Sequence, residues 1–132
     1  MEMKVAFSGE KRVSASFKGF VVETDQPEAA GGGNTAPSPF DLFLASIGTC
    51  AGYYVLSFCL ERGIPHEGVE LLLRTERDRE TGLIGKIEIA IRLPGGFPEE
   101  YREAVIRAAS ACTVKEHLTR PPEFFIYAEK KV

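Results

Sequence analysis

Tryptophan is absent from this 132-residue chain, which contains only two histidines and three cysteines. The cysteines include no Cys-x-x-Cys pair and the histidines, His66 and His117, are not paired, so the spacing predicts no metal site. Basic runs are absent too: 16 basic residues stand against 19 acidic ones, for a net charge of -3 at pH 7. Nucleic acid is therefore not an expected partner.

An apolar signal segment is also missing at the start, where Met1-Glu2-Met3-Lys4 leads directly into a short alternating strand. We therefore expect a cytoplasmic protein. Three cysteines without short paired spacings argue against a disulfide scaffold, and in a reducing compartment they favour free, buried or catalytic thiols. The length fits a single domain, residues 1–132, with a real hydrophobic core.

Charge is missing from one long stretch, because no residue from 42 to 60 is charged. Ser38 can cap a helix before this stretch, Asp41 suits its positive end, and Gly63 favours its termination. These signals predict a helix that is apolar on nearly all sides and must be surrounded by other elements. The stretch could span a bilayer. The amphipathic strands that follow need a core, however, so the sequence favours a buried helix and no membrane.

Alternating apolar and polar residues predict antiparallel strands on both sides of this helix. Before it, residues 3–21 are expected to form a hairpin with one buried face, and a flexible glycine-rich loop follows. After it come two long strands, a second helix from Pro98 to about Cys112, a short helical turn and a closing strand. The chain therefore belongs to the α+β class, with helices on one face of an antiparallel sheet. The expected inward-facing residues are Val69, Leu71, Leu73, Ile87, Ile89, Ile91, Leu93, Tyr101, Ala104, Val105, Ala108, Ala109, Phe124, Ile126 and Ala128.

Cys50 and Cys59 lie on opposite sides of the long helix, because nine positions at about 100° each place them about 180° apart. Cys59 shares a stripe with Gly48 and Gly52, so it is expected to be a small buried hydrophobic residue. Cys50 lies on a face of mixed character that is suited to lining a pocket. The other residues of that face are Phe43, Ser46, Ile47, Tyr53, Tyr54 and Ser57.

Cys112 lies at a break between two helical segments, with Lys115 shortly after it. A helix N-terminus or a nearby lysine favours the thiolate, which is the nucleophilic form of cysteine. The residues alone leave two readings of Cys112 open, a reactive thiol and a buried core residue. A cysteine hydrolase would need a histidine beside the thiol, and His117 lies about 140° round the helix from Cys112, which makes it a poor partner.

Two phrases resemble the OsmC/Ohr family: PSPFDLFLA at residues 37–45, continued by Gly48-Thr49-Cys50, and ACTV at residues 111–114. The resemblance covers nearly the whole chain and implies an OsmC-like fold in an intertwined homodimer, with active sites between subunits. Phe40 stands where the well-studied peroxidases of the family have a glutamate, and Thr113 where they have a proline. The chain therefore resembles a divergent branch of the family.

The resemblance further implies a thiol-dependent peroxidase that reduces organic hydroperoxides. By position, Cys50 would be the peroxidatic thiolate and Cys112 the resolving thiol. Arg12 would be the thiolate-stabilising cation, with Asp41 as its carboxylate partner and with Lys11 and Lys18 as alternative cations. It implies no bound cofactor, because an external dithiol would reduce the resulting disulfide. The competing interpretation is a non-catalytic protein that binds an apolar or thiol-containing small molecule beside Cys50.

Overall fold

The uncharged stretch forms helix α1, Pro39–Arg62, as predicted. The structure, a computed structural model, describes residues 1–131. Two reciprocal hydrogen bonds cap the start of α1: the Asp41 N–H donates to Ser38 Oγ, and the Ser38 N–H donates to Asp41 Oδ2, both at 3.2 Å. This arrangement satisfies two of the backbone donors that a helix start leaves unpaired.

The other end of α1 closes in a left-handed turn at Gly63, whose φ is 64°. The Ile64 N–H donates to the Cys59 carbonyl at 2.9 Å, and the Gly63 N–H donates to the Leu60 carbonyl at 3.4 Å. Both bonds belong to the Schellman motif, in which glycine adopts the positive φ without strain. Ile64 and Cys59 are both buried in the same apolar cluster, so the end of the helix is fixed by packing as well.

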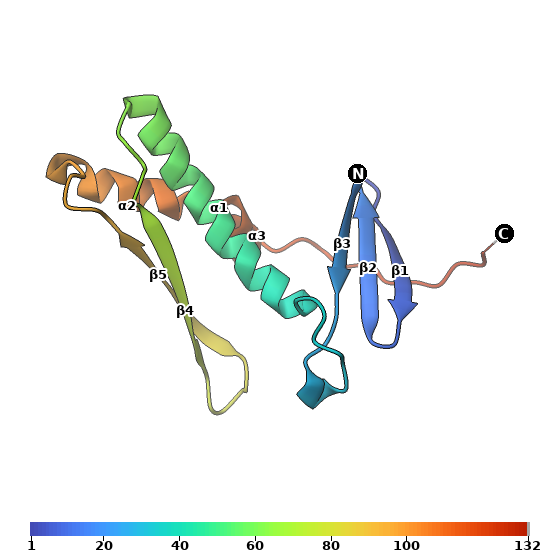
Figure 1. Cartoon of the computed structure of the whole chain (residues 1–132). Helices are drawn as coiled ribbons and strands as arrows, with labels where there is room; N and C mark the ends of the chain where they lie inside the picture. The colour runs from blue at the N-terminus through green and yellow to red at the C-terminus, as the bar shows by residue number, and fades with distance from the viewer. Residues whose placement is uncertain (132) are drawn as a thin grey trace. The chain divides into compact units, whose positions relative to one another are not determined.

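The chain divides into two compact units, Met1–Ser46 and Ile47–Val132. The first contains an antiparallel sheet with strand order β1-β2-β3, blue in Figure 1. Its strands are β1 at Lys4–Gly9, β2 at Arg12–Phe17 and β3 at Phe20–Thr24.

The prediction of one hairpin over residues 3–21 is wrong, because the chain turns a second time at Lys18 and Gly19. Their φ angles are 48° and 81°, and two residues with positive φ make the two-residue turn that matches strand twist. The predicted buried face is wrong as well. Val5 is 62% exposed and Phe7 is 91% exposed.

Asp25 organises the loop between β3 and α1, so the prediction of a flexible glycine-rich loop is wrong for this part of the chain. Its side chain is 1% exposed. The Thr35 hydroxyl and N–H donate to Asp25 Oδ2 at 2.6 and 3.0 Å, and the Gln26 N–H donates to Oδ1 at 2.7 Å. These bonds, the Thr35 hydroxyl first among them, lower the pKa of Asp25 to about 2. One carboxylate thus holds the two sides of the loop together.

We expect Asp25→Asn to lower the melting temperature by several degrees at pH 7, because an amide cannot replace the carboxylate as acceptor of all three bonds. The ordinary pKa of an aspartate is about 3.9. Since the folded pKa is lower, the stabilisation is complete above about pH 4 and is lost as the pH falls toward about 2. The variant should therefore lose less stability than wild type on acidification.

Circular dichroism melts at pH 7 and pH 3 measure this effect. Asp78→Asn is a matched control, because the Asp78 carboxylate also accepts backbone N–H bonds, from Glu80 and Thr81, but in an exposed turn. Equal losses of stability in both variants would show that the buried Asp25 carboxylate contributes no more to stability than the exposed Asp78 carboxylate.

The second unit contains an antiparallel pair of strands, β4 at Glu70–Arg77 and β5 at Ile84–Arg92. The predicted alternation is confirmed, because apolar residues face one another on one side of the pair. On the other side, three of the cross-strand pairs join opposite charges, which supports this register over its neighbours, and the fourth joins Leu72 with Ala90. The apolar pairs are Leu71 with Ile91 and Leu73 with Ile89, and the charged pairs are Glu70 with Arg92, Arg74 with Glu88, and Glu76 with Lys86.

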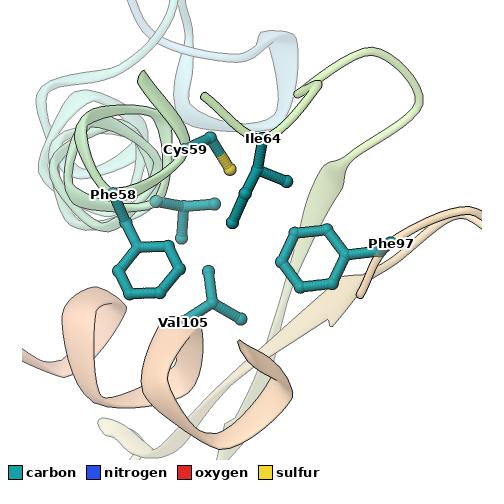
Figure 2. Close-up of a cluster of buried hydrophobic side chains, with 6 residues drawn as sticks. Phe58, Cys59, Ile64, Phe97 and Val105 are labelled. Carbon is teal, nitrogen blue, oxygen red and sulfur yellow. The ribbon is translucent and has the colours of Figure 1, made fainter. Parts of the chain in front are cut away.

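Three helical segments follow the hairpin: a 3₁₀ turn at Glu99–Tyr101, α2 at Arg102–Ser110 and α3 at Thr113–Thr119. The second helix and the short turn after it are thus confirmed. Helices α1 and α2 share one core with the inward face of the β4–β5 hairpin (Figures 1 and 2). The buried members of this core are Val55, Phe58, Cys59, Ile64, Phe97 and Val105.

Among residues 1–131, α1 is the one helix with the length and hydropathy of a membrane span. Core helices of soluble proteins have the same properties. Val55, Phe58 and Cys59 place one face of α1 in the protein core. The prediction that other elements surround the helix is not met in the single chain, because Tyr53 and Leu60 on its other sides are more than 60% exposed.

The predicted closing strand with Phe124, Ile126 and Ala128 is wrong for the single chain, since residues 121–131 form no regular element. A strand needs a neighbouring strand to satisfy its backbone groups, and in residues 1–131 the paired strands are β1 to β3 and β4 with β5. Phe124 is 80% exposed and Ile126 is 94% exposed.

Candidate active site

Cys50 and Cys112 lie together, although 62 positions separate them in the chain. Cys50 is half-buried on α1, and Cys112 is buried at the N-cap of α3. The Cys112 side chain lies close enough to Cys50 to lower the pKa of the Cys50 thiol, and both thiols are free. The reading of Cys112 as a buried residue and its reading as a partner of Cys50 are thus compatible.

Cys112 is held by both helices. Its sulfur accepts the Lys115 N–H at 3.4 Å, which caps α3, and its thiol donates to the Ile47 carbonyl of α1 at 3.9 Å. A residue that caps one helix and contacts the backbone of the other has little freedom to move. The sequence motif that places a cysteine at the start of α3 therefore also brings it beside α1.

The start of α3 favours the thiolate form of Cys50. The backbone N–H of Val114 contributes most to lowering the pKa of Cys50, and the Cys112 thiol and the N–H and hydroxyl of Thr113 act in the same direction. Burial acts in the opposite direction but is outweighed. Because hydrogen bonds to the charged form stabilise it, Cys50 forms the nucleophilic thiolate more readily than an ordinary cysteine.

Cys59 has the contrasting environment that the helical wheel predicts. It is fully buried in the apolar core, where its side chain points in among Phe58, Ile64, Phe97 and Val105 (Figure 2). Burial raises the pKa of the Cys59 thiol. The two cysteines of α1 thus differ in chemistry because they lie on opposite faces, one facing hydrogen-bond donors and one facing hydrocarbon.

A cavity of about 190 Å³ adjoins Cys112. Its walls are mostly apolar, and Lys115 brings the one ionisable nitrogen. Such a cavity suits a small apolar molecule with one polar group. Its lining residues are Ile47, Ile87, Ile89, Ile91, Ile106, Ala109, Ser110, Cys112 and Lys115.

The two remaining site candidates, Arg12 and Asp41, belong to the first unit. Arg12 begins β2, and its guanidinium donates to the Ser8 carbonyl at 3.4 Å. The carboxylate of Asp41 accepts the Ser38 N–H at the start of α1. Within residues 1–131, no cluster of three or more His, Cys, Asp or Glu side chains is arranged to hold a metal ion.

Sequence reasoning missed two contributions to the site. The Val114 N–H cannot be recognised from a residue pattern, because any residue except proline offers the same donor at that position. The helical wheel puts Tyr54 on the Cys50 face, but the residue pattern indicates no role for it. Its hydroxyl lies 2.8 Å from the Thr113 hydroxyl, and its position four residues after Cys50 was the available signal.

The model of the family described as OsmC-like protein matches residues 31–126. This range includes both Cys50 and Cys112 and excludes Arg12. No curated protein sequence matches the chain.

Solved structures resemble the whole fold. A protein of Psychrobacter arcticus 273-4 assigned to osmotic stress and detoxification response shares 22% identity, over 86% of this chain and 85% of that one, with a TM-score of 0.73. The organic hydroperoxide resistance protein OhrB of Bacillus subtilis shares 21% identity, over 89% and 90%, with a TM-score of 0.54.

A Vibrio cholerae protein assigned to organic hydroperoxide resistance, with captopril bound in one of its active sites, shares 20% identity. The match covers 92% of this chain and 85% of that one, with a TM-score of 0.56. At these identities the similarity establishes the fold.

Proposed function

We propose that this chain, which belongs to the OsmC-like protein family, is a thiol-dependent peroxidase that reduces organic hydroperoxides to alcohols. The observation that carries the proposal is the pairing of Cys50, whose pKa is lowered by the start of α3, with a second thiol, Cys112, that contributes to this lowering. A thiolate nucleophile beside a resolving thiol is the arrangement that two-cysteine redox chemistry requires.

The reaction would proceed in three balanced steps. The Cys50 thiolate attacks the distal oxygen of the hydroperoxide, the O–O bond breaks, and the alkoxide takes a proton and leaves as the alcohol. Cys50 is thereby oxidised to a sulfenic acid. The Cys112 thiol then attacks this sulfur, which forms the disulfide and releases water. Two exchange steps with an external dithiol restore both thiols and leave the donor oxidised.

Arg12 would supply the positive charge beside the thiolate, with Asp41 holding its guanidinium. The support is position: Arg12 lies in the N-terminal hairpin, where the family resemblance implies an arginine, and Asp41 lies at the start of α1. Asp41 already accepts a backbone N–H, and an ionised carboxylate can accept further bonds from a guanidinium. The proposal includes a homodimer. It also includes a cytoplasmic location, because reduction of the disulfide needs a reducing compartment. Recovery of the protein only in the periplasmic or secreted fraction would contradict this location.

Limiting cumene hydroperoxide is expected to join Cys50 and Cys112 in a disulfide. The test uses Cys59→Ala, because trypsin leaves Cys50 and Cys59 together in the peptide of residues 19–62. Mass spectrometry should then find this peptide joined to that of residues 108–115, with one disulfide formed per peroxide consumed. Peroxide consumption without the joined peptide would contradict the resolving role of Cys112.

A second candidate function is binding of a small molecule without turnover. The cavity beside Cys112 and the captopril bound by the similar Vibrio cholerae protein favour it. Titration calorimetry with captopril, run beside the peroxide assay, distinguishes the two. Binding by a chain that consumes no peroxide above background would select this second function.

A further inference from the structure

Tyr54 and Thr113 connect the helices that carry the two cysteines. Tyr54 is half-buried on α1, one helical turn after Cys50, and Thr113 is the first residue of α3. Their hydroxyl oxygens lie 2.8 Å apart. Residues four apart on a helix lie on the same face, so Cys50 and Tyr54 both face the start of α3.

The Thr113 hydroxyl also acts on Cys50, since it lowers the pKa of that thiol, as a hydrogen-bond donor to the thiolate does. A hydroxyl carries one proton and can therefore donate only one hydrogen bond. When Thr113 donates to the thiolate, its oxygen can only accept from Tyr54. The direction of the Tyr54–Thr113 bond is thus fixed by the charge on Cys50.

We propose that Tyr54 is a positioning residue for Cys50 that acts through Thr113. The Tyr54 O–H donates to the Thr113 oxygen, and the Thr113 O–H donates to the Cys50 sulfur. This inference rests on the proposed thiol chemistry and adds a residue to it. Successive hydrogen bonds polarise one another, so the tyrosine strengthens the donor that the thiolate receives.

These two hydrogen bonds also give Thr113 a role as a donor, at a position where a proline could not donate. Proline has neither a side-chain donor nor a backbone N–H, whereas Thr113 offers both to Cys50. Because Thr113 is exposed, water competes for its hydroxyl, and the effect of Tyr54 is modest. The effect of Tyr54 stabilises the thiolate form of Cys50 and leaves the neutral thiol nearly unaffected.

The rate at which iodoacetamide alkylates Cys50 measures the thiolate fraction, and it requires no peroxide. At a pH where the thiol predominates, we expect about tenfold slower alkylation in Thr113→Val and about threefold slower in Tyr54→Phe. Thr113→Ser should restore the wild-type rate. Tyr53→Phe is the matched control, because Tyr53 is the adjacent tyrosine and is 62% exposed; its rate should not change.

Two features separate this role from general destabilisation. At alkaline pH, where Cys50 is fully ionised, the differences should vanish or slightly reverse, because a more basic thiolate is the better nucleophile. In Thr113→Val, adding Tyr54→Phe should have no further effect. An unchanged rate in Tyr54→Phe, or an effect that persists undiminished in the double variant, would overturn the inference. If the protein consumes no peroxide, the proposed function is refuted. The alkylation rates would still test the role of Tyr54.

Discussion

Replacing Cys50 by serine is expected to reduce peroxide consumption by more than about 100-fold, to the level of the buffer. A serine hydroxyl stays protonated at neutral pH, so the hydrogen bonds from Val114 and Thr113 would no longer face a charged nucleophile. The measurement follows the loss of cumene hydroperoxide in the presence of a dithiol. Equally slow consumption by wild type and by Cys50→Ser would refute the peroxidase proposal.

Cys59→Ala is the matched control for Cys50→Ser, because both cysteines belong to α1 and only one faces the donors of α3. Cys59 lies in the core with a raised thiol pKa, so its replacement should leave the rate within about twofold once the protein is folded. Cys112→Ser should retain the first reduction of peroxide and lose the intramolecular disulfide. The three variants together separate the attacking thiol, the resolving thiol and the bystander.

Arg12 can be tested in the same assay. If its guanidinium stabilises the thiolate, Arg12→Gln should slow consumption by about tenfold, since a charged neighbour of a thiolate contributes on this scale. Lys11→Gln is the control, because it removes the neighbouring positive charge in the same turn. A larger loss in Lys11→Gln would assign the role to the lysine.

The parts of the fold that sequence patterns predicted well depend on nearest neighbours in the chain. Ser38 and Gly63 mark the ends of α1 because capping is a local interaction. The β4–β5 pairing follows from alternation, and the facing charges reinforce its register. The second turn, at Lys18 and Gly19, was missed because a lysine with positive φ has no distinctive pattern.

The candidate site could be predicted only in part, because spacing along one helix says nothing of a residue 62 positions away. The helical wheel separated Cys50 from Cys59 correctly. Only the family resemblance suggested that Cys112 belongs with Cys50, and the structure adds the physical reason: the cap of α3 also reaches the Ile47 carbonyl. Backbone donors such as the Val114 N–H can be located only in three dimensions.

Deleting residues 123–132 is expected to abolish a homodimer of the full-length chain. These residues carry the apolar side chains of the predicted closing strand, and Phe124, Phe125, Ile126 and Tyr127 are each 79% exposed or more. A run of large apolar side chains so exposed is costly in water. The predicted closing strand can form if a second copy supplies its neighbouring strand. The edge strands β1 and β3 have backbone groups that can pair with it.

Light scattering at micromolar concentration tests this directly. The full-length chain should have twice the 14.5 kDa mass of one chain, and the shortened chain should lose that species. Lys130→Glu with Lys131→Glu is the matched control, because it changes the end of the same segment and keeps the apolar run. Val5 and Phe7 of β1 are exposed apolar residues, and a partner chain would bury them as well as the tail. A folded, monomeric full-length chain would therefore contradict the homodimer. A shortened chain that still dimerises would assign the contact to α1.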